Sequence, residues 1–420
     1  MKKRALLIGC NYAGTKAELH GCVNDVLRMH KSLLEKFEFA EEDITVMIDT
    51  DKSTIQPTGV NIKKTLARLI SEVGPGDVLF LHYSGHGTQV PAETGDEEDD
   101  GLDEAIVPCD LNLLTDDDFR LLFKKIKDGV NFTFVSDSCH SGGLIDHEKE
   151  QIVGIDTRNS GKGPTRELQI SADDENVWEE GTRNFSADLR FSADDEGWEE
   201  YEDFDFSPVG FRDKSLSIET LAQMLAEKTG HEVKKGSIRT SLYELFGDNA
   251  SPSVKVFVNF IAKRLHRRKT EGGESGSAHE HNFFGKFGGF LKHKFDALDL
   301  DGDDPKPADD VPSSGVNLSG YAGKKPQNVT ERVADETGIL VSGCMSSETS
   351  ADANPSGDTS KAYGALSNAI QLVLQKKKGF VSNRDLVLET RKLLKKQGFT
   401  QHPCLYCSDA NVSRPFICNF

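Results

Sequence analysis

Hydrophobic positions in the first third of the chain alternate between short continuous runs and stretches with apolar residues every three or four positions. Continuous apolar runs predict strands buried on both faces of a sheet, and the helical spacing predicts helices that cover it. The expected strands are Ala5–Ile8, Ile44–Ile48, Val78–His82, Ala105–Val107 and Phe132–Val135. The expected helices are Asn24–Phe37, Asn61–Val73 and Asp116–Ile126. The alternation predicts an α/β fold, with a mostly parallel central β-sheet sandwiched by helices.

The pattern divides the remainder of the chain. Residues 1–150 form the large segment, and residues 151–215 are acidic, poor in aliphatic side chains and contain an imperfect duplication, ISADDENVWEE and FSADDEGWEE. That composition predicts a flexible linker. Residues 216–270 carry a helical block, and residues 271–330 are a low-complexity loop rich in Gly, Asp and Lys. In residues 331–420, GILVSGC predicts a strand and two amphipathic stretches predict helices, so we expect this small segment to complete the same core.

The net charge indicates which partners to expect, and the cysteine content indicates the cellular compartment. The 420 residues carry a net charge of −19, which disfavours nucleic acid and anionic membranes and favours cationic ligands or divalent metal. No run approaches the roughly 18–20 apolar residues of a membrane span. The opening MKKRALLIG fits a first strand better than a signal peptide. Eight cysteines without a secretory signal therefore predict reduced thiols in the cytoplasm, or in the nucleus.

Two strand ends carry residue types that suit nucleophilic catalysis. DVLFLHYSGHGT displays His86 between glycines, and FTFVSDSCHSGG displays Cys139. Chemistry collects at the carboxyl ends of parallel strands, and a histidine near a thiol can take its proton. The amides of Gly87 and Cys139 are candidate donors to the oxyanion of a tetrahedral intermediate. A single strand-end cysteine is often only a packing residue, but the pairing of two such turns favours catalysis. His140 receives no role, because we expect its side chain to face away from that of its neighbour.

Two carboxylates indicate which substrate side chain the site receives. Asp137 lies two residues before Cys139, so strand alternation places it on the same face. A carboxylate there disfavours a thiolate, which makes it a poor activator but a suitable receptor for a basic substrate side chain. Asp25 follows the turn after the first strand and can join it, although the alternative is a first-turn carboxylate that interacts with the helix dipole. A basic substrate side chain is therefore expected at this position.

The motifs are similar to those of a known family. HYSGHGT is followed 53 positions later (139 − 86) by DSCHSGG, and both occur with GCVNDV and DGLDE. This combination resembles the metacaspases of the caspase-like clan, and the long interruption without an N-terminal prodomain resembles the type II metacaspases of plants and green algae. The resemblance covers nearly all of Lys3–Leu144 and Gly338–Phe420. It implies a caspase–haemoglobinase fold and a monomeric cysteine endopeptidase that acts on protein and peptide substrates. It also implies calcium activation, autocatalytic processing, and stress, wound or programmed-cell-death responses.

The resemblance also assigns residues to the substrate pocket and to a calcium site. The positions that match the family's pocket for Arg or Lys are Cys22, Asp25, Ser84 and Asp137, so the resemblance implies cleavage after Arg or Lys. The positions that match the calcium ligands are Asp103, Asp116, Asp117 and Asp146. The acidic run DEEDDGLDE is not an EF-hand loop, because Val107 stands where the bidentate glutamate is required. The alternative for Asp116 and Asp117 is a helix cap and first turn.

The self-cleavage site departs from the family pattern. Type II metacaspases resembling this chain cut after a basic residue, often a lysine that follows a hydrophobic pair, whereas LAQMLAEKTG has Ala226 at the matching position. Ala226 is either natural or a substitution that blocks processing. Lys228, Lys214 and Arg212 are the nearby alternatives. We expect the uncleaved block to lie across the catalytic groove and to keep the enzyme latent.

Two other functions compete with a peptidase. One is a catalytically silent relative that retains the fold as a binding scaffold. The other is a nucleotide-binding module, but neither G-x-G-x-x-G nor G-x-x-x-x-G-K-[ST] follows any expected strand. The C-terminal HPCLYC contains a CxxC pair, and without a second pair at suitable spacing it predicts two reduced cysteines rather than zinc ligands.

Overall fold

The computed structural model describes residues 1–91, 102–140, 144, 150–152, 211–255, 257–258, 338–345 and 348–417. The chain divides into two compact units, and the larger comprises Met1–Lys255 and Ala334–Phe420. Everything described below belongs to this larger unit. The duplicated part of the predicted linker, the predicted loop 271–330 and the end of the predicted helical block, residues 259–270, lie outside the described residues.

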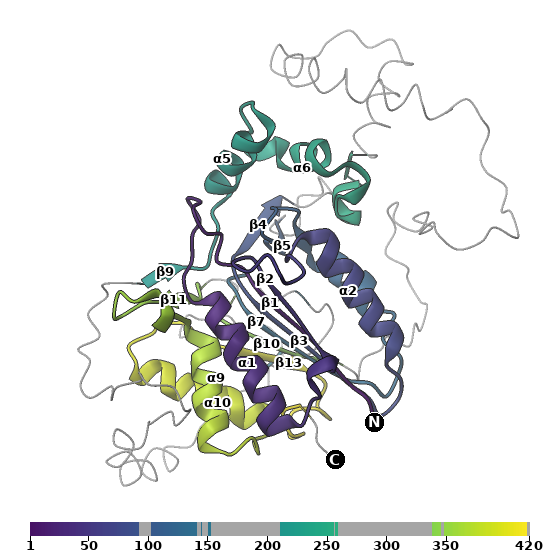
Figure 1. Ribbon diagram of the computed structural model, residues 1–420, viewed down its shortest axis with the longest axis vertical. Helices are drawn as coiled ribbons and strands as arrows, with labels where there is room; N and C mark the ends of the chain where they lie inside the picture. The colour runs from purple at the N-terminus through teal and green to yellow at the C-terminus, as the bar shows by residue number, and fades with distance from the viewer. Residues whose placement is uncertain are drawn as a thin grey trace, which may run out of the picture. The chain divides into compact units, whose positions relative to one another are not determined.

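A seven-stranded sheet forms the centre of this unit, in the order β2-β1-β3-β7-β10-β13-β8 (Figure 1). Its strands are β1 (Lys3–Gly9), β2 (Ile44–Ile48), β3 (Val78–Ser84), β7 (Asn131–Asp137), β8 (Glu150–Ile152), β10 (Gly338–Ser342) and β13 (Cys404–Cys407). The first five strands in the spatial order are parallel, and β13 and β8 add antiparallel pairs at the far end. Because β10 pairs directly with β7, the C-terminal segment extends the sheet begun by the N-terminal segment.

Helices cover both faces of the sheet, as the continuous apolar strands predict. One layer contains α1 (Cys22–Phe37), α9 (Ala365–Lys376) and α10 (Asn383–Lys396), and the other contains α2 (Gly59–Glu72) and α3 (Asp116–Phe123) (Figure 1). Apolar clusters lie on both faces of the sheet, and alternate residues of β1 belong to one or the other. Ala5 and Leu7 pack towards α1, whereas Leu6 packs on the opposite side. The fold is therefore the α/β sandwich that the sequence predicts.

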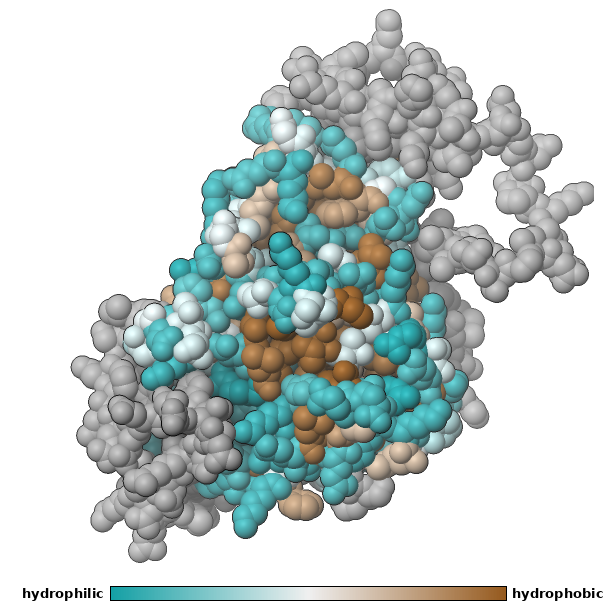
Figure 2. Space-filling model, viewed as in Figure 1, coloured by the Kyte–Doolittle hydropathy of each residue, from teal (hydrophilic) through white to brown (hydrophobic). Residues whose placement is uncertain are grey.

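Figure 2 shows the face onto which Figure 1 looks, where apolar residues gather between α1 and α2 over the β2 edge of the sheet. Thr45 and Val46 of this edge strand are partly buried. Among the described helices, none is both long enough and apolar enough to cross a membrane.

Two small sheets stand at the carboxyl ends of the parallel strands. One is β4 (Gly87–Pro91), β5 (Leu102–Ile106) and β6 (Leu114–Thr115), and the other is β12 (Tyr363–Gly364), β11 (Ala351–Ala353) and β9 (Phe211–Asp213). The helical block contributes α5 (Ile218–Thr229) and α6 (Ile238–Phe246). Short 3-10 turns occupy Glu41–Asp43, Lys235–Ser237, Gly247–Asn249 and Thr359–Lys361. The strand expected near residue 105 thus belongs to a small sheet and not to the central one, and β9 comes from a stretch assigned to the flexible linker.

Candidate active site

The imidazole of His86 follows the end of β3 and is buried, with 3% of the residue exposed. Its Nε2 lies 2.8 Å from the carbonyl oxygen of Ala17. Because a carbonyl only accepts hydrogen bonds, this contact assigns the ring proton to Nε2 and leaves Nδ1 as the basic nitrogen. Among the described residues, Nδ1 makes no hydrogen bond. Burial lowers the pKa of His86, so the ring is neutral at physiological pH and able to accept a proton.

The thiol of Cys139 lies just beyond the end of β7 and is fully buried. Its Sγ accepts a hydrogen bond from the Ser350 amide at 2.9 Å and lies 3.4 Å from Oδ1 of Asp213. Burial raises the pKa of Cys139 well above the ordinary thiol value, and the neighbouring Cys344 and Asp213 raise it further. In this state the sulfur is therefore a protonated thiol rather than a thiolate.

The turns that carry His86 and Cys139 are neighbours because β3 pairs with β7 in register. Gly87 packs so closely that an added Cβ would lie 1.8 Å from the carbonyl oxygen of Cys139, so a side chain at this position would collide with the backbone of Cys139. Within the described part of the chain, no hydrogen bond joins His86 to Cys139: the thiol contacts Asp213 and Ser350 instead. The two groups are thus brought together, but the thiol is held by other partners.

A buried lysine from the chain itself fills the acidic pocket. The Nζ of Lys214 lies 3.0 Å from Oδ1 of Asp137 and 3.7 Å from Oδ2 of Asp25, and none of the three side chains is exposed. The same Nζ donates to Oγ of Ser84 at 3.0 Å and to the carbonyl of Asp137 at 3.1 Å. The fourth expected pocket residue, Cys22, is also fully buried, and burial raises the pKa of its thiol well above the ordinary value, against the lowering effect of the Lys214 charge. The structure therefore brings all four expected pocket residues around one ammonium group.

The two carboxylates of the pocket are not equivalent. Burial raises the pKa of Asp25 to about 7, although Lys214 opposes the shift. Burial also acts to raise the pKa of Asp137, but the closer Lys214 and the hydrogen bonds from Ser367 outweigh it, so this pKa falls below the ordinary value. These carboxylates in turn raise the pKa of Lys214, against the lowering effect of burial. Asp137 is thus the permanent counter-ion, and Asp25 titrates near neutral pH.

The backbone around Lys214 is extended and forms hydrogen bonds with β11 and with Gly87. β9 pairs antiparallel with β11, and beyond this ladder the Lys214 amide donates to the Ser350 carbonyl at 2.9 Å. The carbonyl of Lys214 accepts from the Gly87 amide at 2.9 Å, and the Leu216 amide donates back to the Gly87 carbonyl at 2.8 Å. The Lys214–Ser215 peptide bond therefore lies at the catalytic turns, with its carbonyl on the amide expected to stabilise an oxyanion.

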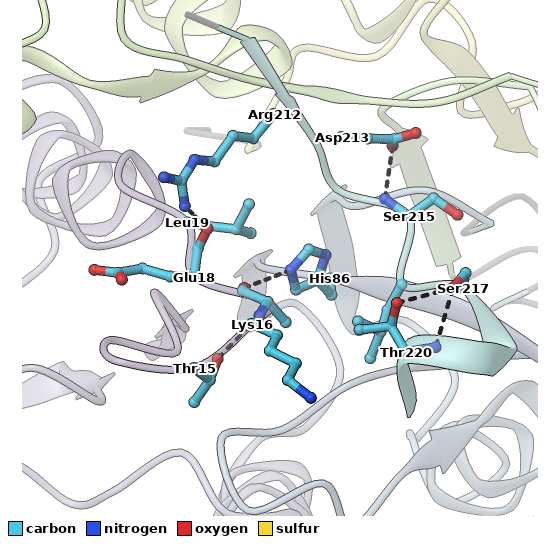
Figure 3. Close-up of a pocket in the computed structure, with 12 residues that line it drawn as sticks. Thr15, Lys16, Glu18, Leu19, His86, Arg212, Asp213, Ser215, Ser217 and Thr220 are labelled. Atoms are coloured by element: carbon cyan, nitrogen blue, oxygen red, sulfur yellow. Dashed lines mark hydrogen bonds between the residues drawn. The ribbon is translucent and has the colours of Figure 1, made fainter. Parts of the chain in front are cut away.

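A cavity of about 530 Å³ opens beside this peptide bond. It is lined by the loop Thr15–Leu19, by His86 and by residues of the segment 212–220. Figure 3 shows the His86 imidazole facing this space, with Asp213 and Ser215 on the strand opposite. The cavity therefore gives access to the Lys214–Ser215 peptide bond from the side of the histidine.

His140 differs from the sequence expectation. Its Nε2 lies 3.1 Å from Oγ of Ser215, the residue after the lysine, whereas we expected the side chain to point away. The strand ends at Asp137 and His140 has a left-handed φ of 51°, so strand alternation does not extend to it. Sequence reasoning also missed Ala17 and Ser350, which act through backbone atoms and leave no residue-type signal.

The expected self-cleavage positions fall in two places, on α5 and in the segment that precedes it. Ala226 packs against the apolar core from α5, and Lys228 lies in the last turn of the same helix. Lys214, named above as an alternative, is the residue in the pocket. Arg212, the remaining alternative, donates from its guanidinium to the Glu18 carbonyl.

The carboxylates expected to bind calcium are partly described. Oδ2 of Asp103 lies 2.5 Å from Nη2 of Arg239 on α6, and Asp117 pairs with Arg120. Asp116 is in the first turn of α3, and Asp146 lies outside the described residues. Within the described ranges, no group of three or more His, Cys, Asp or Glu side chains is gathered as a metal cluster. The carboxylate oxygens suit a hard cation such as calcium, but arginines neutralise two of them in this state.

Comparisons with known proteins show which family this chain is similar to. A family described as "Metacaspase, peptidase C14 domain" matches residues 3–148. Metacaspase-4 of Arabidopsis thaliana is 44% identical over 446 residues, which cover 100% of both chains. Metacaspase-6 and Metacaspase-7 of the same plant are 44% and 43% identical, again over 100% of both chains. These full-length matches confirm the family resemblance drawn from the motifs.

Proposed function

Because the chain belongs to the metacaspase family, cysteine peptidases with a caspase-like fold, we propose that it is a calcium-activated endopeptidase that cleaves after lysine or arginine. One observation carries the specificity: the chain's own Lys214 is held by Asp137, Asp25 and Ser84 while its carbonyl lies on the Gly87 amide. This is the arrangement that a substrate with a basic residue before the cut requires. Arginine is included because its guanidinium pairs well with carboxylates.

His86 and Cys139 supply the chemistry. Nδ1 of His86 accepts the thiol proton, and Sγ of Cys139 attacks the carbonyl carbon of the basic residue, whose oxygen becomes an oxyanion held by the Gly87 amide. His86 then gives the proton to the departing amine as the peptide C–N bond breaks. Water hydrolyses the resulting thioester, releases the new carboxylate and restores the thiol. The Ala17 carbonyl keeps Nε2 protonated throughout, which keeps Nδ1 available.

The same segment accounts for latency. Residues 211–216 occupy the substrate position within the chain, and the sulfur contacts Asp213 and Ser350 rather than His86. An external substrate therefore has to wait until this segment leaves the groove. Self-cleavage after Lys214 would free one of its ends, which is the processing step we propose for the zymogen.

Calcium is proposed to bind at the acidic turns near α3. Asp103, Asp116 and Asp117, with Asp146, would hold it, and it would supply positive charge to a group of carboxylates. Burial raises the pKa of Asp103 although Arg239 opposes the shift, and the nearby Asp117 raises this pKa further, so a cation shared by the two carboxylates would be favoured. Arg239 joins this site to the helical block, so the state of the site and the position of the block are coupled.

Peptidase activity can be tested with fluorogenic peptides that end in Lys, Arg or Asp, each with and without calcium. We expect calcium-dependent release from the Lys and Arg peptides alone, and none from the Cys139→Ala variant. Release from the Asp peptide only would contradict the pocket assignment. A chain that cleaves none of the peptides, even with calcium, would instead support the scaffold alternative.

A further inference from the structure

An aromatic contact joins the segment in the groove to the C-terminal segment. Phe211, the first residue of β9, packs edge-on against Phe399, with ring centroids 5.1 Å apart and an interplanar angle of 67°. Phe211 is three residues before Lys214, so it is the fourth residue counted back from the Lys214–Ser215 bond. An edge-on pair at this distance is a favourable aromatic geometry.

Phe399 is held in place by its own surroundings rather than by Phe211. Its amide donates to the Leu394 carbonyl at 3.0 Å, after a turn in which Gly398 has a φ of +80°. Its ring packs against the small buried cluster of Ala365, Ala369 and Leu394, where α9 meets α10. The apolar surface offered to Phe211 is therefore anchored to the folded body.

A buried glutamine fixes the register between this aromatic ring and the catalytic groove. Oε1 of Gln401 accepts from the Ala351 amide at 2.9 Å, and its Nε2 donates to the Gly343 carbonyl at 2.8 Å. Ala351 is the β11 residue that pairs with Asp213. Because Gln401 follows Phe399 by only two residues, the ring lies at a set distance along any peptide that pairs with β11.

Alternation along β9 separates this contact from the acidic pocket. Phe211 and Asp213 lie on one face of the strand, and Arg212 and Lys214 lie on the other. Arg212 reaches the Glu18 carbonyl and Lys214 enters the pocket, whereas Phe211 meets the C-terminal segment. The fourth residue is thus contacted by groups that take no part in recognising the basic residue.

We infer that Phe399 is a specificity-determining residue, which selects an aromatic or large aliphatic side chain at the fourth position before the cut. This inference rests on the proposed function, since it concerns the same groove. A peptide bound as residues 211–214 are bound buries its fourth side chain against Phe399, whereas a small or charged side chain there gains nothing.

The test uses the calcium-activated full-length chain and four fluorogenic peptides that share Arg-Asp-Lys and differ only in the preceding residue: Phe, Leu, Ser or Asp. We expect kcat/KM for the Phe peptide to exceed that for the Ser peptide about tenfold, mainly through KM. In Phe399→Ala the advantage of Phe should fall to about twofold while the Ser peptide is cleaved as before. Phe399→Leu should keep part of the preference.

Phe380→Ala is the matched control, because Phe380 is 83% exposed and lies outside the groove. Equal cleavage of the four peptides by the unaltered chain would overturn the inference while leaving cleavage after lysine intact. A Phe399→Ala variant that loses the Phe and Ser peptides equally would also overturn it, since that is the result of a structural role. If the chain cleaves none of the four peptides and also fails to cleave a peptide ending in Arg, the result would instead count against the proposed function.

Discussion

The ammonium nitrogen of Lys214 lies 3.0 Å from Oδ1 of Asp137, and both side chains are completely buried. A buried charge is stable only when it is paired and hydrogen-bonded, and Lys214 meets this condition through Asp137, Ser84 and Asp25. The backbone on either side of Lys214 follows the path of a bound peptide. The chain thus contains a substrate-like segment in its own groove.

The two pocket carboxylates should contribute unequally to substrate binding. Asp137→Asn removes the closer, permanently charged partner, so kcat/KM for a Lys peptide should fall by a factor of about 30 to 1,000. The loss of kcat/KM in Asp25→Asn should be smaller below pH 7 and larger above it. The reason is that the pKa of Asp25 is raised to about 7, so its charge is present only as the pH rises through that value.

Steady-state kinetics from pH 6 to 8 measure this difference, and Asp43→Asn serves as the control, since Asp43 pairs with Arg4 on another part of the surface. Equal losses for the two pocket variants at every pH would contradict the assignment of Asp137 as the principal counter-ion.

The thiol of Cys139 should resist alkylation in the calcium-free chain. Its pKa is raised well above the ordinary value, chiefly by burial and then by Cys344 and Asp213, so the thiolate fraction is small below that raised value. The rate of reaction with iodoacetamide should therefore stay low through pH 8 and increase only above the usual thiol range of about 8.5. Mass spectrometry of the Cys139 peptide follows the reaction.

Asp213→Asn removes one of the groups that raise this pKa, so alkylation at pH 8 should become about two to five times faster. Rapid labelling of the unaltered, calcium-free chain at pH 7 would show that the thiol is not held in the protonated, buried state described here.

Arg239 should oppose calcium binding. Its guanidinium is 2.5 Å from Asp103, and the side chains are 5% and 17% exposed. Arg239→Gln leaves Asp103 without its cation, so the free energy of unfolding in the absence of calcium should fall by about 1–3 kcal/mol. Calcium should then bind more tightly, because it no longer competes with the arginine.

Urea unfolding and calorimetric titration with calcium, both on a Cys139→Ala background that prevents self-cleavage, measure the two effects. Arg68→Gln is the control, since Arg68 pairs with Glu72 at the surface. Calcium affinity that is unchanged or weaker in Arg239→Gln would separate this ion pair from the proposed metal site.

The fold and the family were predictable because their signals are local. The buried strands are continuous apolar runs, and the glycine-flanked turns at His86 and Cys139 follow directly from them. The location of Lys214 in the pocket was not predictable to the same degree. FRDKS has no periodic pattern, and its position depends on pairing with Ala351–Ala353, which lie far along the chain.

The role of Phe399 was hidden for a related reason. The sequence QGFT carries no motif. The Phe399 ring contacts Phe211 only because β9 pairs with β11, which the local sequence does not reveal. The pairing of Arg239 with Asp103 was likewise missed. Arg239 lies on α6, and the hydrophobic pattern of that helix predicts only which face is apolar.

The most direct test of the central claim is to map where the chain cuts itself. The purified protein is incubated with calcium, and the fragments are identified by intact mass and N-terminal sequencing. We predict a first cut between Lys214 and Ser215, its loss in Lys214→Gln, and its persistence in Lys228→Gln. A first cut elsewhere, or one at the same bond that persists in Lys214→Gln, would contradict the claim that Lys214 occupies the groove as the chain's own substrate.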